Sequence, residues 1–419
     1  TGLLEFKNIY RPARVTHYDQ STGTLTLHNY MDFVDLTDYA TLSYELNCDG
    51  QVVSAGSVPF PGGFRLPPHA DGTLPLPLDV PAKGKCFVNI CYHCKQDSAL
   101  IKADHLLGFD EIPLQNSDPR NQDAVQLLGR PAGDGLITIR ETDRMLVLSC
   151  EQFTYVFNKL TGLFDKMTFA NEPLLDQPMG FNVWRAPTDN DRKLKADWYA
   201  AHYDHAATNA YHTEYTVTAS GVTLHTHVGI AAICVQKFLD LDVTWTVANN
   251  GSVDLALHAQ RNTVFPELPR FGLRLFLPQE MSQVNYYGMG PMECYCDKHH
   301  AASHNSYTAT VWQLHEDYIR PQENGSHFDC DYVMLAGDAV RLTAVGTQPF
   351  SFNASHYTQE ELTRKAHNYE LEPCSSTVLC LDYAQNGIGS ESCGPRLLEQ
   401  YRLDDATFNF GLRLFPEKK

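Results

Sequence analysis

The sequence predicts an all-β protein built mostly of antiparallel strands, and two patterns support this prediction. Apolar and polar residues alternate in short runs, as expected for strands that bury one face. In the clearest run, residues 239–247, the odd positions are apolar and the even positions are Asp or Thr. The turn signal Asn249-Asn250-Gly251 follows, and alternation resumes at Val253, so we expect a hairpin here.

The same alternation recurs along the chain, and helical signals are poor. Further alternating runs occur at residues 24–28, 52–55, 213–218 and 408–415. The best helical segment is 358–367, where Thr358 is a suitable N-cap and Glu361 follows three residues later. The aromatic and polar segment 198–211 lacks alternation, so we expect a covering loop, with a mobile flap as the alternative.

A polar stretch at residues 115–136 predicts a linker or surface strap between two domains. Residues 1–114 have short strands at regular spacing and Pro-rich turns, which suit an immunoglobulin-like β-sandwich. Residues 137–419 contain too many strands for one small sandwich and no repeat of fixed period. A large two-sheet sandwich is therefore expected there.

Composition excludes several classes of partner. The 419 residues carry a net charge of -18 without a block of Lys and Arg, which argues against nucleic acid and anionic membranes. No run of about 18 apolar residues predicts a membrane span. The 12 Cys residues are scattered, and the N-terminus has no signal-peptide pattern, so we expect a cytoplasmic protein with free thiols. The missing initiator Met suggests a processed chain or a piece cut from a longer one.

Two dense runs, residues 287–298 and 318–325, are rich in Gly, Pro and carboxylates. Neither has helical or strand periodicity, so each predicts a loop held in one shape for a purpose. Their acidic residues are Glu293, Asp297 and Glu323. A structural role, accepting backbone N–H groups or pairing with arginines such as Arg185 and Arg270, is favoured over a local catalytic pair.

Two motifs invite a metal, and neither is specific. Cys91-Tyr92-His93-Cys94 is a CxxC within an alternating strand pattern, and no second pair stands at zinc-site spacing. His299, His300 and His304 follow Asp297, but their spacing on a loop is unspecific, and hydrogen-bonding histidines are the default. No metal site is expected.

Seven motifs in order along the chain resemble the β-galactosidases of glycoside hydrolase family 2. They lie at residues 5–12, 27–33, 153–163, 184–191, 268–272, 287–298 and 318–325. The closest match is Arg185-Ala186-Pro187-Thr188-Asp189-Asn190-Asp191, which is similar to the family's Arg-Ala-Pro-x-Asp-Asn-Asp signature. Each motif alone is weak, whereas their shared order makes the resemblance specific.

The resemblance implies an immunoglobulin-like domain followed by a galactose-mutarotase-like super-sandwich. In that family the catalytic carboxylates, and most ligands of the Mg and Na ions, come from a barrel that would precede residue 1. We therefore expect no catalytic residue and no cofactor in this segment, which would be inactive alone. Its partner would be the barrel-containing remainder or a large subunit, in a homo- or hetero-oligomer that cleaves terminal β-D-galactosides such as lactose. A natural small subunit and an excised C-terminal piece both remain open.

The resemblance also implies the site residues. Several family members present a Trp at the position matched by Cys393, where its ring forms a wall for the sugar. Here Cys393 stands in a Gly-rich loop, residues 387–395, and would leave a wider aglycone pocket. The residues expected to contact substrate are Glu391, Ser392 and Cys393, and a purely structural turn is the alternative for this loop. Those expected to shape the surrounding loops are Arg185, Asp189, Asn190, Asp191, Glu293, Asp297, Gln322, Glu323 and Asn324.

Two other functions stay open at this point. A stand-alone carbohydrate-binding module would need an exposed aromatic platform, and at least one of the four Trp, Trp245, is in a core-like position. An independent mutarotase-like sugar epimerase would need a His and a carboxylate acting across a sugar-sized cleft, and the sequence alone shows no such pair.

Overall fold

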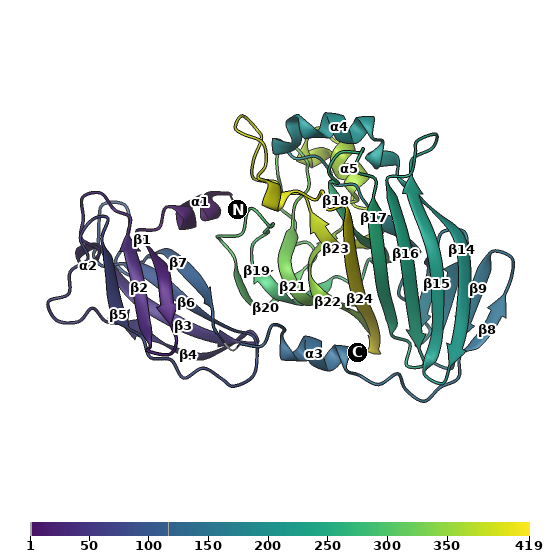
Figure 1. Cartoon of the computed structure of the whole chain (residues 1–419), viewed down its shortest axis with the longest axis horizontal. Helices are drawn as coiled ribbons and strands as arrows, with labels where there is room; N and C mark the ends of the chain where they lie inside the picture. Colours follow the sequence, from purple (N-terminus) through teal and green to yellow (C-terminus); the bar gives the residue numbers. More distant parts are fainter. Residues whose placement is uncertain (1, 116) are drawn as a thin grey trace. The chain divides into compact units, whose positions relative to one another are not determined.

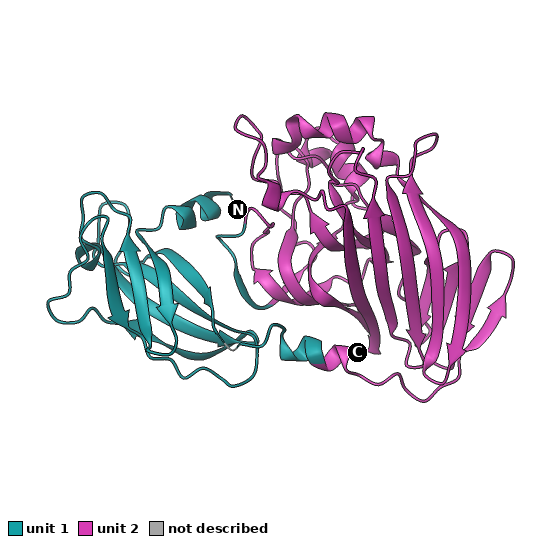
Figure 2. Ribbon diagram, viewed as in Figure 1, with its two compact units in different colours: residues 1–125, 299–306 teal, residues 126–298, 307–419 magenta. Residues whose placement is uncertain are grey.

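The computed structural model describes residues 2–115 and 117–419, and the chain divides into two compact units (Figure 2). Unit 1 comprises Thr1–Val125 and His299–Ser306, and unit 2 comprises Gln126–Lys298 and Tyr307–Lys419. The stretch expected to be a linker is divided between them and contains a helix, α3 (Gln122–Leu128).

Unit 1 is a sandwich of two antiparallel sheets (Figure 1). Its three-stranded sheet has the order β1 (Ala13–Asp19), β2 (Thr24–Asn29), β5 (Asp71–Pro75). Its four-stranded sheet has the order β4 (Gln51–Val58), β3 (Ala40–Cys48), β6 (Cys86–Cys94), β7 (Leu106–Pro113). The alternating residues meet in one core, with Leu25, Leu27, Val88 and Ile90 fully buried. Two short helices, α1 (Gly2–Ile9) and α2 (Leu36–Tyr39), complete the unit.

Unit 2 is a larger sandwich of a five-stranded and a twelve-stranded sheet, counted over the described residues. The smaller sheet has the order β12 (Glu172–Pro173), β11 (Leu163–Phe169), β10 (Phe153–Asn158), β9 (Met145–Ser149), β8 (Thr138–Glu141). The larger one follows the path β13 (Gln177–Asn182), β18 (Arg270–Pro278), β23 (Ser376–Gln385), β22 (Val340–Ser355), β24 (Thr407–Lys418), β17 (Val253–Arg261), β16 (Leu239–Ala248), β15 (Gly221–Ala231), β14 (Ala207–Thr218). Off this path lie β19 (Gln283–Gly290), β20 (Ser303–Thr310) and β21 (Ser326–Ala336).

Trp245 marks where the two sheets of unit 2 meet. Its ring contacts Phe164 edge-on at 5.3 Å between centroids, and its indole N–H donates to the Gly162 carbonyl at 2.9 Å. Gly162 has φ +74°, and a Cβ there would lie 2.8 Å from a methyl of Val228. Only glycine therefore allows the turn between β10 and β11 to approach the large sheet this closely.

The all-β prediction is confirmed, with most of the described chain in strands and loops. Each alternating run lies in a strand, and the runs around Asn249-Asn250-Gly251 pair as the expected antiparallel hairpin. The expected helix is α5 (Gln359–Arg364), whose N-cap Thr358 accepts from the Glu361 N–H. The CxxC motif lies within β6, as its alternation indicates. No helix in the described ranges is long and apolar enough to cross a membrane.

Two expectations were wrong. Segment 198–211 is not a covering loop, because it contains the end of α4 (Leu194–Ala200), a 3₁₀ turn, η2 (Tyr203–His205), and the start of β14. Its aromatic residues anchor it, since Trp198 and Tyr203 are fully buried and donate to the carbonyls of Glu267 and Pro266. The run 287–298 was expected to be a loop throughout, but its first four residues belong to the strand β19. Most positions of this strand are buried, so apolar and polar residues do not alternate along it.

Candidate functional site

Arg185 holds the first stem of the 387–395 loop. Its side chain is fully buried, and its guanidinium donates to the carbonyls of Asn386 and Gly387, the latter at 3.1 Å. The same guanidinium forms two bonds with Asp191, from Nη2 at 2.7 Å and from Nε at 3.3 Å. Asp191 also accepts from the backbone N–H of Thr188 at 2.8 Å. The carboxylate thus fixes both the Arg185 guanidinium and the turn at residues 188–191.

Asp297 holds the next two residues of the loop through their backbone. Its two oxygens accept the N–H groups of Ile388 at 3.0 Å and Gly389 at 2.7 Å. The Asn190 amide donates to the Ile388 carbonyl at 2.6 Å. A Cβ on Gly387 would lie 2.6 Å from an Asp297 oxygen, so the glycine permits this close approach. Residues 184–191 and the run 287–298, which lie about a hundred residues apart in the sequence, therefore hold the same loop.

The second stem is held by Arg396, whose Nη2 donates to both oxygens of Glu267, at 2.7 and 2.9 Å. Between the stems, Ser392 and Cys393 are exposed, and Glu391 adopts φ +79°. Among the residues that the structure describes, the side chains of Ser392 and Cys393 make no hydrogen bond. Two of the three residues expected to contact substrate, Ser392 and Cys393, thus form the uncommitted tip of a loop with fixed stems, while the Glu391 carboxylate interacts electrostatically with Arg396.

Glu293 joins the two dense runs. Its carboxylate pairs with Lys298 Nζ at 2.8 Å, accepts the Gly325 N–H at 3.0 Å and accepts the hydroxyl of Tyr318. Burial opposes ionisation, but the Lys298 ammonium and these hydrogen bonds outweigh it and lower the pKa of Glu293. Burial likewise opposes the charge on Lys298, and Glu293 overcomes it, so the pKa of Lys298 is raised. Glu293 is therefore an ionised structural anchor.

The surroundings of the 318–325 loop are shaped by polar contacts of Gln322, Asn324 and Asp189. The Gln322 side-chain oxygen accepts the Asp189 N–H at 3.1 Å, and the Asn324 oxygen accepts the Glu316 N–H at 3.0 Å. The side chain of Asp189 is exposed and lies 3.9 Å from Arg320. The contacts of Asp189 with Gln322 and Arg320 connect residues 184–191 with residues 318–325.

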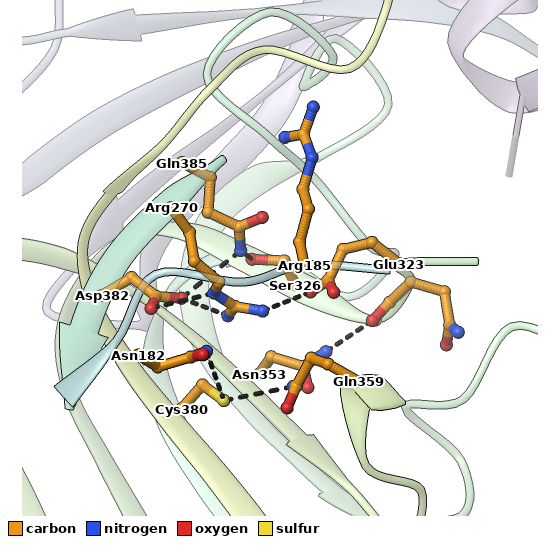
Figure 3. Close-up of polar contacts among 12 residues, drawn as sticks. Asn182, Arg185, Arg270, Glu323, Ser326, Asn353, Gln359, Cys380, Asp382 and Gln385 are labelled. Atoms are coloured by element: carbon orange, nitrogen blue, oxygen red, sulfur yellow. Dashed lines mark hydrogen bonds and ion pairs between the residues drawn. The ribbon is translucent and has the colours of Figure 1, made fainter. Parts of the chain in front are cut away.

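Arg270 lies at the centre of a buried network (Figure 3). Its guanidinium lies between Glu323, 2.8 Å from Nη1, and Asp382, which is bound through Nε at 3.2 Å and through Nη2. Burial raises the pKa of both carboxyl groups despite the arginine. Gln385 extends the network by donating to Ser326 at 3.1 Å and to Asp382 at 3.4 Å.

The carboxylates singled out from the sequence are all engaged within the chain. Glu293 and Glu323 pair with cations, and Asp297 accepts backbone N–H groups. This arrangement fixes loop geometry: Glu293 and Glu323 are buried, and both oxygens of the half-buried Asp297 accept backbone N–H groups. Glu267, Arg396 and Asp382 were not predicted as site residues from the sequence. Single polar residues that lie far apart in the sequence form no local motif.

The histidines considered as metal ligands make other contacts. His304 is buried, lies 2.6 Å from Glu111 through Nδ1 and stacks on Phe87 at 4.3 Å. His299 and His300 contact each other ring to ring. Across residues 2–115 and 117–419, no group of three or more His, Cys, Asp or Glu is placed to hold a metal ion.

Comparison with known families decides the affiliation of the chain. Residues 149–414 match the β-galactosidase small chain family, and residues 25–115 match β-galactosidase domain 4. This chain belongs to the β-galactosidase family. The match confirms the resemblance carried by the seven motifs. The two matched regions fall on the large and the small sandwich, respectively.

Curated relatives include the β-galactosidases of Actinobacillus pleuropneumoniae, 38% identical over 418 residues, and Staphylococcus xylosus, 32% identical over 418 residues. The alignments cover 100% and 99% of this chain and 40% of each relative. The chain thus spans about 40% of the length of these relatives and corresponds to their C-terminal part.

Solved structures with a similar arrangement include the galactose 1-epimerase of Lactobacillus acidophilus NCFM, with a TM-score of 0.36 and 9% identity. That alignment covers 68% of this chain and 98% of the epimerase. A putative aldose 1-epimerase of Escherichia coli K12 gives a TM-score of 0.35 and 9% identity, covering 68% of this chain and 100% of its own.

Proposed function

We propose that this chain is the non-catalytic C-terminal part of a β-galactosidase that hydrolyses terminal β-D-galactosides such as lactose. In this role the chain forms interfaces with a barrel-containing partner, and the tip of the 387–395 loop completes the mouth of the active site. The observation that carries the proposal is the loop itself. Its stems are fixed by Arg185, Asp297 and Arg396, while Ser392 and Cys393 at its tip are exposed.

Rigid stems with an uncommitted tip suit a surface that presents side chains to a ligand held elsewhere. The three candidate carboxylates are bound within the chain, so hydrolysis requires an acid and a nucleophile from the partner. As the family resemblance implies, the Mg and Na ions would be bound mainly by the partner. Twelve free cysteines favour a reducing compartment, so we place the protein in the cytoplasm.

The test is hydrolysis of a chromogenic β-galactoside by the purified chain, alone and mixed with a barrel-containing partner. We expect no hydrolysis alone and hydrolysis in the mixture. Sugar release by the chain alone, lost when one of its own carboxylates is changed to the amide, would refute the proposal.

The loop is tested in the active mixture with Cys393→Trp, which places a large ring at the tip. We expect an altered KM and an altered ratio of transglycosylation to hydrolysis, because the ring narrows the aglycone side. Trp in place of the exposed Leu136 is the matched control and should change neither quantity. Unchanged values for Cys393→Trp would show that the tip does not reach the substrate.

A further inference from the structure

Two buried cysteine thiols of unit 1 lie in direct contact. The Sγ atoms of Cys48 and Cys86 are 2.8 Å apart, and the Cys86 thiol donates to the Cys48 sulfur. Cys48 is the last residue of β3 and Cys86 the first residue of β6, and the two lie opposite each other in the antiparallel register. Cys48 is 8% exposed, whereas Cys86 is fully buried. At this separation no other atom fits between the two sulfurs.

The backbone around the pair suits a disulfide between the two strands. The Cys86 N–H donates to the Ser117 hydroxyl at 2.6 Å, and the Cys86 carbonyl accepts the Leu114 N–H at 3.1 Å. Leu114 and Ser117 follow β7, so both peptide groups of Cys86 point away from β3. Cys48 and Cys86 therefore form a pair without mutual backbone hydrogen bonds, in which the Cα atoms lie about 4.5 Å apart. A disulfide spans about 4.4–6.8 Å between Cα atoms, so it can form here without movement of either strand.

The segment before β6 keeps the Cys48 sulfur in place. The Cys48 thiol donates to the Lys83 carbonyl at 3.4 Å. Gly84 has φ +109°, and a Cβ there would overlap the Cys48 sulfur, so only glycine lets the backbone pack this closely against it. Gly84 is itself fixed by Asp118, whose carboxylate accepts the Gly84 N–H at 2.6 Å and whose N–H donates to the Gly84 carbonyl at 2.9 Å. The two sulfurs are thus held side by side by the surrounding chain.

The two thiols differ in reactivity. Burial raises the pKa of both, that of Cys86 to about 12. The hydrogen bond between them opposes this rise in the pKa of Cys48 and adds to the rise in the pKa of Cys86. Cys48 also has the larger exposed surface. Cys48 is therefore the sulfur that reacts first with an oxidant, and Cys86 is the neighbouring thiol that can resolve the product.

We propose that Cys48 and Cys86 are an oxidisable thiol pair that hydrogen peroxide, an oxidant small enough for a nearly buried sulfur, converts to a disulfide. The Cys48 thiolate attacks one peroxide oxygen, the O–O bond breaks, and the leaving hydroxide takes up a proton to become water. Cys48 is then a sulfenic acid. The Cys86 sulfur attacks the Cys48 sulfur, the S–O bond breaks, and a second water leaves with the Cys86 proton. The two thiols together lose two electrons, which the peroxide gains.

The disulfide would act as a reversible staple in unit 1. It would close a loop of residues 49–85, which contains β4 and β5, and would thereby restrict the unfolded chain and stabilise the folded one. In a reducing compartment such a bond is transient, because thiols reduce it again once the oxidant is consumed. Both cysteines lie in unit 1, and the proposal does not depend on the role of the chain in hydrolysis.

Peptide mapping by mass spectrometry tests the bond directly. The reduced 419-residue chain is treated with hydrogen peroxide, its remaining thiols are alkylated, and the digest is compared with and without dithiothreitol. We expect a peptide pair linked through Cys48 and Cys86 that dithiothreitol separates. The exposed Cys234 has no such partner, so Cys234→Ser is the matched control and should form the linked pair at the parent rate. Cys48→Ser should abolish the linked pair and leave Cys86 as a thiol.

The staple is tested by the urea dependence of alkylation at Cys94, a buried thiol of β6 that becomes accessible when unit 1 unfolds. Oxidation should raise the urea midpoint of this alkylation by about 1–2 M, and dithiothreitol should reverse the shift. In Cys48→Ser, peroxide should leave the midpoint unchanged.

Three results would overturn the proposal. The first is a parent chain in which peroxide produces no linkage between Cys48 and Cys86. The second is a sulfinic acid at Cys48 beside an unmodified Cys86 thiol, which would show that Cys86 does not resolve the sulfenic acid. The third is an unchanged midpoint in the chain that carries the disulfide.

Discussion

Arg270 and Glu323 form an ion pair of 2.8 Å in which both side chains are almost completely excluded from solvent. Asp382 is the second carboxylate on the same guanidinium. One cation thus holds two buried acids, one on the strand β23 and one in the 318–325 loop. Removal of the arginine would leave two buried acids without the cation that pairs directly with both of them.

Arg270→Met should therefore lower the free energy of unfolding of unit 2 by about 3–5 kcal/mol. Urea unfolding followed by Trp fluorescence measures this, because Trp184, Trp198, Trp245 and Trp312 all lie in unit 2. The exposed Arg140→Met is the matched control and should change the value by less than about 0.5 kcal/mol. Similar effects of the two changes would contradict a central role for Arg270.

Lys298→Met should lower stability at pH 7 by about 2–4 kcal/mol, since it leaves the Glu293 carboxylate buried without its cation. The double variant Lys298→Met, Glu293→Gln should recover much of this loss, because a neutral amide does not need a countercharge. The double-mutant cycle, measured by urea unfolding, gives the coupling energy. Additive effects of the two changes would show that Lys298 and Glu293 are not energetically coupled.

The buried His327 predicts a loss of stability in mild acid. Burial lowers its pKa to about 4, so the folded state binds fewer protons than the unfolded state between that value and the ordinary pKa near 6.5. The free energy of unfolding is therefore not reduced by this group above pH 6.5. It falls by about 3 kcal/mol in total as the pH drops from 6.5 toward 4. His327→Phe should flatten the pH dependence in this window.

Unfolding by urea at a series of pH values from 4 to 7 provides the measurement for His327→Phe. The exposed His205→Phe is the control, and its pH profile should parallel that of the parent chain. Identical profiles for the parent and His327→Phe would assign the acid sensitivity to other groups.

Asp297→Ala should release the first stem of the 387–395 loop, because two backbone N–H groups lose their acceptor. Limited proteolysis within this loop should then become about tenfold faster, which corresponds to about 1.4 kcal/mol of lost local stability. Asp338→Ala is the control and should be cleaved at the parent rate. In the reconstituted enzyme the released loop should also raise KM, whereas parent-like cleavage would show that Asp297 does not hold the loop.

Local patterns in the sequence predicted the strands but not the contacts between distant segments. Alternation in residues 239–247 depends on one strand and one neighbouring core, so it is visible within nine residues. The pairing of Arg396 with Glu267 joins positions more than a hundred residues apart and has no local signal. The α4 helix was missed because its seven residues bury only Leu194 and Trp198, which is too short a span for a helical period.

The loop tip was found through the family resemblance, whereas its anchors were found only in three dimensions. Arg185 and Asp297 were expected to shape loops, but nothing in either motif specified that both would bind residues 386–389. Which distant segments meet at this loop depends on the strand order of the large sheet, and the alternation of residues within single strands does not reveal that order.

The separation between fixed stems and a free tip has a consequence for engineering. Within the part of the chain that the structure describes, no side chain of residues 390–395 forms a hydrogen bond with the large sandwich. We therefore expect these residues to tolerate replacement or lengthening at little cost in folding, because closure entropy grows only slowly with loop length. Under the role proposed for the tip, libraries confined to these six positions would vary product preference, while the contacts of Arg185, Asp297 and Arg396 keep both stems of the loop in place.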